Sequence, residues 1–420
     1  MVRSIAGSNR TRYLLILCSA TMAARMLVGA TSAIYLVSKG ISAQDIVYLK
    51  AFQCLLILAA EVPLGVLADR VDRRLVIAAG LGSACLWLFL TGFGSGASTL
   101  YLAEAFNALS LATFSGAIEA ELVDAWSADH GMNNLRALFS RLTTWSFTAT
   151  SGAALVGGLL AFNDPKSRVP WTVAGMAVFA LLLSLLFAYR PHNASMRSTS
   201  HESLLKSASR QAGLASITWS NIKEVIKDQE NRARLIPVIV LSGALAAAFQ
   251  LIIQYWQLIV GPNSLTDHGW FFGGAFFLMM LVQSRHKWLA QYLRSRALYY
   301  MAALVTPGIL LAIGAWAQLP AVLVVLLICL CLWSYQAVVV DINATLAEKA
   351  SGGSRATVFS IRSTLGRGVF VAFSPVASMA IHRYGAVGIT FCVVILTVTA
   401  LVISIKYRVA DSFQSFRIPN

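Results

Sequence analysis

The sequence predicts an all-α, polytopic membrane protein with about twelve spanning helices, and two observations lead to this prediction. First, 57% of the 420 residues are hydrophobic and 12% are charged, with a mean hydropathy of +0.69, whereas soluble proteins hold roughly 25% charged residues. Second, a spanning helix needs roughly 20 mainly apolar residues, and short polar breaks separate about twelve such stretches. We expect spans near residues 13–37, 45–67, 75–97, 99–122, 139–162, 170–189, 234–260, 268–286, 296–314, 320–346, 357–381 and 386–407.

The first span is expected to remain in the protein, because it is too long for the core of a signal peptide and leads straight into a second hydrophobic segment. All six cysteines lie in apolar segments, where a thiol behaves mainly as a small hydrophobe. We therefore expect no disulfide framework, no metal site and no cofactor.

The basic residues predict the orientation of the chain. If the N-terminus is cytoplasmic, the outside loops hold only four of the 33 lysines and arginines, namely Lys39, Lys166, Arg168 and Arg383. The positive-inside rule then puts both termini in the cytoplasm of a bacterial-type inner membrane. Topology also accounts for the net charge of +15 without nucleic-acid binding, because the basic residues are dispersed over the inside loops.

The longest polar stretch divides the chain into two halves. Residues 190–233, rich in Ser, Lys and Arg, separate an N-terminal six-helix bundle, 1–189, from a C-terminal one, 234–420. This linker suits helices lying on the inner membrane surface, and a solvated linker is an equally good interpretation. Short similarities recur between the halves at a nearly constant offset, Asp124 with Asp341 among them. They predict two pseudo-symmetric bundles related by an axis along the membrane normal.

A charged hairpin joins the second and third spans. From Gly65 to Arg74 the chain reads Gly-Val-Leu-Ala-Asp-Arg-Val-Asp-Arg-Arg. This segment resembles the signature loop of the major facilitator superfamily, Gly-x-Leu-Ala-Asp-Arg-x-Gly-Arg-Arg, and Asp72 stands where that pattern has its second glycine. Twelve spans and a central linker extend the resemblance over the whole chain. The segment that begins at Glu61 is also similar to a branch of the family with many exporters.

The resemblance implies a lock on the cytoplasmic side. In the family the loop aspartate faces the N-terminus of helix 11, where unpaired N–H groups carry a partial positive charge. Asp69 would therefore hold this side closed. The neighbouring arginines would supply partners for carboxylates on nearby helix ends, or would only fix the topology. The other residues that we assign to gating are Glu61, Gly65, Arg70, Arg73, Arg74, Arg141, Asp341 and Arg362.

Several ionisable side chains fall inside the expected spans. Such a residue costs roughly 2.5 to 3.5 kcal/mol at the bilayer centre, so it is kept mainly where it lines a cavity or finds a partner. Arg25 lies about 18 Å into the first span and needs such a partner, for which Glu119 is a candidate. Glu121 and Asp124 share one face of the fourth span. These carboxylates are candidates for proton coupling, and interfacial water is an equally good explanation for them.

Two ion pairs are expected at the cytoplasmic mouth. Asp341 in the tenth span and Arg362 in the eleventh lie at matching depth, and Asp124 with Arg141 would be the corresponding pair in the first half. Arg367, near the middle of the eleventh span, is a further candidate for substrate binding or coupling.

The seventh span carries a polar and aromatic run where a purely structural span would hold Leu and Val: Gln250, Gln254, Tyr255, Trp256 and Gln257. Helices 1, 4, 7 and 10 line the cavity in the family that the chain resembles, so we expect this run to form a substrate wall. Packing between helices is the alternative, because a buried Gln can satisfy a neighbouring backbone.

These features together predict a secondary active transporter of a small organic solute, working by alternating access, coupled to protons and exporting, as a monomer in the lipid bilayer. Import of a nutrient or siderophore is the alternative, and a channel or a transport-like receptor is a rival of another class. An enzyme is not expected, because the chain has no paired-His metal motif, nucleophile elbow or phosphate-binding glycine loop.

Overall fold

The computed structural model of the chain is almost entirely helical over the residues that it describes, which are 2–130, 135–188, 229–261, 268–285, 297–349 and 355–406. Those ranges contain no strand, so the all-α prediction is confirmed. The expected linker, 190–233, falls largely outside them, and the boundary between halves stays a prediction.

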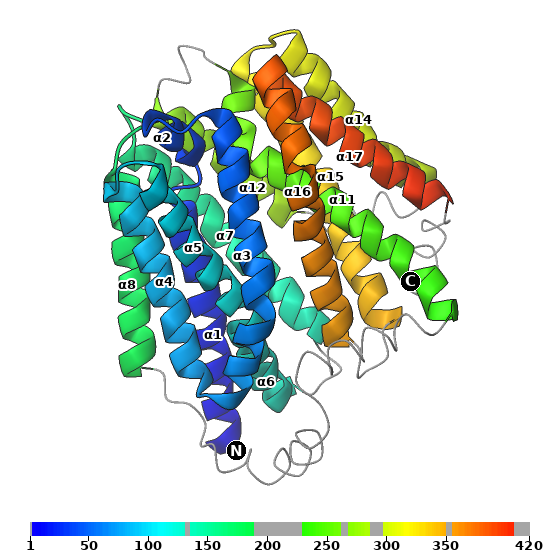
Figure 1. The fold of residues 1–420 in the computed structure, drawn as a ribbon. Helices are drawn as coiled ribbons and strands as arrows, with labels where there is room; N and C mark the ends of the chain where they lie inside the picture. Colours follow the sequence, from blue (N-terminus) through cyan, green and yellow to red (C-terminus); the bar gives the residue numbers. More distant parts are fainter. Residues whose placement is uncertain are drawn as a thin grey trace.

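The first six spans form one bundle (Figure 1). Two of them are interrupted: α1 and α2 together make the first span, and the π-helix η1 joins α5 to α6 in the fourth. The elements are α1 (Val2–Met26), α2 (Ser32–Ser38), α3 (Ala43–Arg70), α4 (Arg73–Phe93), α5 (Ala97–Thr113), η1 (Phe114–Ile118), α6 (Glu119–His130), α7 (Leu135–Leu160) and α8 (Val169–Ala188).

The last six spans form the second bundle (Figure 1). They are α11 (Gln229–Val260), α12 (Gly269–Ser284), α14 (Ala297–Trp316), α15 (Ala321–Lys349), α16 (Arg355–Tyr384) and α17 (Ala386–Lys406). Most helix ends agree closely with the expected spans. The helices α1 and α6 run further, because their backbone hydrogen bonding continues into polar residues beyond the apolar stretch.

Length and composition mark seven of the described helices as able to cross a membrane. Their apolar parts are Ala43–Glu61, Arg73–Phe93, Val169–Phe187, Val238–Val260, Ala321–Val339, Ser363–Tyr384 and Ala386–Ile403. The helix α12 and the Val305–Trp316 part of α14 are shorter apolar helices. The spans α1 and α5–α6 carry charged side chains along their length, which are described below.

The two bundles meet more closely at one end than at the other. We call the end that holds α2 the α2 end, and the end where α3 turns into α4 the hairpin end. Figure 1 shows the helices of the two bundles converging toward the α2 end and diverging toward the hairpin end. The long contacts between bundles run along α7 with α12 and along α3 with α16.

Glycines bring α7 and α12 into backbone contact. A Cβ atom added at Gly158 would lie 2.3 Å from the Cα of Gly273, and one added at Gly269 would lie 1.9 Å from the carbonyl oxygen of Ala161. No larger side chain fits at these positions. The same backbone approach is familiar from small-residue contacts between membrane helices.

Each bundle has a hydrophobic core, and the second core extends across the boundary. It includes Trp256 of α11 together with Leu36 of α2 and Ile46 of α3. The apolar contact between the bundles therefore continues around the α2 end.

Candidate functional site

Asp72 is the N-cap of α4. Its carboxylate accepts a hydrogen bond from the backbone N–H of Arg74 at 2.9 Å, which satisfies one of the unpaired donors at the start of the helix. The carboxylate that departs from the family pattern thus has a structural role. The Arg74 side chain reaches α8, where its Nε donates to the carbonyl of Leu185 at 3.2 Å.

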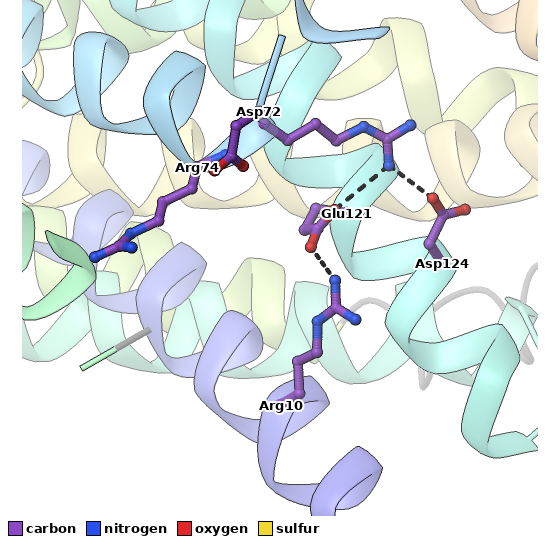
Figure 2. A network of polar contacts seen from close by, with 6 residues as sticks. Arg10, Asp72, Arg74, Glu121 and Asp124 are labelled. Atoms are coloured by element: carbon purple, nitrogen blue, oxygen red, sulfur yellow. Dashed lines mark hydrogen bonds and ion pairs between the residues drawn. The ribbon is translucent and has the colours of Figure 1, made fainter. Parts of the chain in front are cut away.

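An ionic cluster ties α1, the hairpin and α6 together at the hairpin end (Figure 2). Arg73 donates to Asp124 at 2.7 Å, and its Nη1 lies 3.5 Å from one oxygen of Glu121. Arg10 of α1 donates to the other oxygen of Glu121. The Glu121 side chain is only 5% exposed, so two guanidinium groups hold its negative charge in a nearly dry setting. This contact set favours a structural tie over a proton carrier at Glu121.

The expected ion pair between Asp124 and Arg141 is not formed. Asp124 accepts from Arg73 instead, and the guanidinium of Arg141 lies 5.3 Å from the centre of the Trp126 ring, in a cation–π contact. The prediction matched the two residues by depth alone, whereas the hairpin places Arg73 beside α6 in this structure.

A second polar network lies inside the first bundle, within the expected membrane depth. Arg25 donates to the side-chain oxygen of Asn107 and to the hydroxyl of Ser110 at 3.2 Å, and its guanidinium lies 4.6 Å from the centre of the Trp87 ring. Asn107 in turn donates to Glu104 at 2.9 Å. Arg25 therefore finds an amide, a hydroxyl and an aromatic face, with a carboxylate one step further away.

Lys50 completes this network from α3. Its ammonium donates to the other oxygen of Glu104 at 2.7 Å, and the Glu104 side chain is 4% exposed. This pair is not among the contacts predicted from the sequence. A signal for it exists, because Lys50 and Glu104 each lie seven residues after the start of their helices, α3 at Ala43 and α5 at Ala97, and both helices begin at the α2 end. Opposite charges at equal depth on two spans that start on the same side predict such a contact.

One ion pair joins the two bundles among the side chains that the structure describes. The Nη1 of Arg367 on α16 lies 2.8 Å from the carboxylate of Glu61 on α3, with 23% and 15% of the two side chains exposed. The sequence singled out both residues, for coupling and for gating, without pairing them. Glu61 lies nine residues before the end of α3 at the hairpin end, which is about 14 Å along the helix axis.

The expected substrate wall on α11 contains polar atoms without partners. Three neighbouring side chains each have such a buried atom: the Oε1 of Gln254, the hydroxyl of Tyr255 and the indole N–H of Trp256. The Trp256 ring stacks on Phe276 with ring centres 5.8 Å apart. Successive residues leave a helix about 100° apart, so these three side chains point in different directions, and Tyr255 and Trp256 are fully buried in the second core. Gln250 is half-buried on the same helix.

Gln257 has a different environment. Its amide oxygen accepts from the backbone N–H of Ala33, and its amide nitrogen donates to the carbonyl of Gly29, both at 2.7 Å. Both partners belong to the interrupted first span. Gln257 thus binds the other bundle, as the packing interpretation of this helix predicted.

Six predicted site residues lie outside the described side chains: Gly65, Asp69, Arg70, Glu119, Asp341 and Arg362. The lock at Asp69 and the pair of Asp341 with Arg362 therefore stay predictions.

The fold and these contacts can be compared with known proteins. The family model of the Major Facilitator Superfamily matches residues 13–375. Comparison with curated proteins finds no match.

Solved structures share the fold at low identity. The nucleoside transporter NupG is 14% identical, with a TM-score of 0.71 over 96% of this chain and 99% of that one. A POT family transporter in complex with 5-aminolevulinic acid is 12% identical, with a TM-score of 0.67 over 94% of each chain. The chain therefore belongs to the Major Facilitator Superfamily and is a multi-pass membrane transporter, not an enzyme.

Proposed function

We propose that this transporter is a proton-coupled secondary carrier that moves a small organic solute across a bacterial-type inner membrane by alternating access. In this mechanism the two bundles rock about a central site, which opens to one side and then to the other. The distribution of basic residues favours a cytoplasmic hairpin end. Close contact at the α2 end then corresponds to a state that is closed toward the outside.

The ion pair between Glu61 and Arg367 is the observation that most supports this proposal. A contact that joins two rocking bodies has to break when they separate along the seam of α3 and α16. Protonation of the Glu61 carboxylate removes the charge that holds Arg367, so proton binding and rocking are linked through one contact. This makes Glu61 and Arg367 our candidates for the coupling pair.

The polar and aromatic run on α11 is our candidate for a solute site between the bundles. Its half-buried members are Gln250 and Gln254, whose carboxamides suit a polar organic molecule, whereas Tyr255 and Trp256 are fully buried in this state. The structural neighbours are named for nucleosides and for 5-aminolevulinic acid, which are small organic molecules of this general kind. Because these neighbours are only 14% and 12% identical to this chain, its substrate has to be identified by testing several classes of solute.

Export is the direction that we propose, because the segment from Glu61 to Gly65 is similar to a branch of the family with many exporters. Import of a nutrient or siderophore is the alternative. Inside-out vesicles distinguish them, since an exporter accumulates labelled solute in such vesicles when their lumen is acidified and an importer does not.

Counterflow in proteoliposomes tests the carrier mechanism. Vesicles loaded with unlabelled uridine, dialanine or 5-aminolevulinic acid are diluted into the same solute in labelled form, and a carrier accumulates the label transiently by exchange. A channel equilibrates the label without accumulation, and a receptor takes up none. Absence of exchange with all three solutes would contradict a carrier for this class.

Glu61→Gln separates coupling from exchange. We expect this variant to retain counterflow, which needs no net proton movement, and to lose accumulation driven by a pH gradient. Asp164→Asn is the matched control, because it neutralises an exposed carboxylate in the loop between α7 and α8. Gradient-driven accumulation that survives in Glu61→Gln would refute the role of this carboxylate.

A further inference from the structure

The interruption of the first span is held by the opposite bundle. Between Met26, where α1 ends, and Ser32, where α2 begins, the backbone forms turns closed by Gly29 N–H to Met26 C=O at 3.1 Å and by Thr31 N–H to Val28 C=O at 3.2 Å. Regular bonding resumes where the N–H of Tyr35 donates to the carbonyl of Thr31 at 2.9 Å.

The two backbone groups that Gln257 binds are those that would bind each other in a continuous helix. Ala33 follows Gly29 by four residues, so in an unbroken α-helix the Ala33 N–H would donate to the Gly29 carbonyl. Here the carboxamide of Gln257 lies between them, with one 2.7 Å hydrogen bond to each. A side chain inserted into the helical hydrogen-bond ladder is a recognised cause of a helix break.

A second residue of the opposite bundle packs against the same point. The ring of Phe276 on α12 occupies the space beside Gly29, where an added Cβ would lie 2.6 Å from a ring carbon. The flanking parts of the span are anchored within the first bundle. Arg25 binds α5 on one side of the break, and the Tyr35 hydroxyl on the other donates to the carbonyl of Gly92 at 2.7 Å.

We propose that Gln257 is a positioning residue that couples closure of the α2 end to the conformation of the first span. When the bundles approach at the α2 end, the carboxamide enters the ladder and the span is interrupted. When they separate, Gln257 withdraws, the Ala33 N–H and the Gly29 carbonyl bind each other, and the span becomes continuous. The Ala33 N–H and the Gly29 carbonyl therefore have a partner in both states, as the membrane interior requires of backbone polar groups. This inference rests on the proposed alternating access.

The test combines two measurements on purified protein in nanodiscs. Spin labels at Lys166→Cys and Arg383→Cys, exposed positions at the α2 end of the two bundles, report opening of that end. Hydrogen exchange of the amides of residues 28–33 reports the state of the first span. Native cysteines are buried in all six positions, which limits background labelling.

Gln257→Ala should increase the open population at least about tenfold, since two hydrogen bonds that favour closure are lost. Exchange of residues 28–33 should become slower, because the continuous helix protects these amides. Mere loss of a packing contact would make the same amides exchange faster. Ser38→Ala is the control beside the break, because the Ser38 hydroxyl is exposed and donates to the carbonyl of Tyr35 at 2.7 Å within the first span, and this variant should change neither measurement.

Ala33→Pro removes the N–H that the continuous helix needs, at the second residue of α2, where proline is tolerated. In the double variant with Gln257→Ala, the slowing of exchange should disappear while the α2 end still opens.

Opening without slower exchange in Gln257→Ala would overturn the inference and leave alternating access intact. A label distance that stays constant in the wild type and in every variant would contradict both the role of Gln257 and the proposed alternating access. If Gln257→Ala does not fold, the test uses the wild type alone. The amides of residues 28–33 should then be protected from exchange in its open population.

Discussion

Glu104→Gln should destabilise the first bundle strongly, through the charge that it leaves on Lys50. The carboxylate lies 2.7 Å from the ammonium, and 4% and 15% of the two side chains are exposed. Coulomb's law with an effective dielectric constant of 20 gives an attraction of about 6 kcal/mol at this distance. Partial solvent screening and desolvation reduce the net effect of breaking such a pair to about 3 to 5 kcal/mol. The hydrogen bond with Asn107 survives, because glutamine keeps an acceptor oxygen.

A double-mutant cycle isolates the pair. Lys50→Met removes the cation, and Lys50→Met with Glu104→Gln should recover about 2 kcal/mol or more relative to Glu104→Gln alone, because Lys50 no longer leaves an unpaired ammonium, while the loss of the Glu104 charge near Arg25 is common to both variants. The assay is chemical unfolding of the protein in mixed micelles, followed by tryptophan fluorescence. Asp45→Asn serves as a control at the exposed start of α3. Additive effects of the two single variants would show that no ion pair operates here and would refute this reasoning.

Four further variants test three structural assignments. Asp72→Ala should lower stability by about 1 kcal/mol through loss of the cap on the Arg74 N–H, whereas Asp72→Gly should cost only a few tenths, as measured by thermal unfolding. Arg73→Met should destabilise the hairpin end by about 1 to 3 kcal/mol, because a nearly buried carboxylate on α6 loses a donor, and limited proteolysis of the hairpin should accelerate. Gly269→Val should force α12 away from Ala161 and weaken closure of the α2 end, measured with the same pair of spin labels. Unchanged stability in Asp72→Ala would count against the cap, unchanged proteolysis in Arg73→Met against the ionic cluster, and an unchanged label distance in Gly269→Val against the contact of α7 with α12.

The spans could be predicted from the sequence because the bilayer imposes a single strong requirement on length and polarity. The interruptions could not. Leu27 to Thr31 reads as ordinary apolar span, and the break depends on a glutamine more than two hundred residues later in the chain. The π-helix at Phe114–Ile118 likewise gives no compositional signal. Local sequence fixes where a helix can exist, while contacts between bundles decide where it is continuous.

The sequence places the charged residues along their spans but does not pair them. Arg25 was expected to need a cavity or a carboxylate, and an amide, a hydroxyl and an aromatic ring receive it. Asp124 was assigned to Arg141, whereas the hairpin supplies Arg73. Depth along a span can be counted from the sequence, but the direction in which a side chain leaves its helix depends on how the helix is rotated. Pairing therefore needs the packing of the bundle, which one sequence without homologues does not give.

The polar contacts of the described side chains fall into two groups. Some hold the helices of one bundle together, and others join the two bundles. The ionic cluster of the hairpin end and the pair of Lys50 with Glu104 lie within the first bundle, so they keep its helices together as one body. Glu61 with Arg367, the carboxamide of Gln257 and the hydrogen bond of 3.0 Å between His382 and Gln44 join the two bundles. Glu61 lies nearer the hairpin end of α3, whereas Gln44 and the partners of Gln257 lie at the α2 end. The two α2-end contacts share no residue, so their contributions to closure of that end should be nearly additive. The combined variant Gln44→Ala with Gln257→Ala should then open the α2 end by the product of the two single effects on the population ratio. A smaller combined effect would mean that both contacts act on one shared local rearrangement, and a rigid-body rocking motion would then be the wrong description.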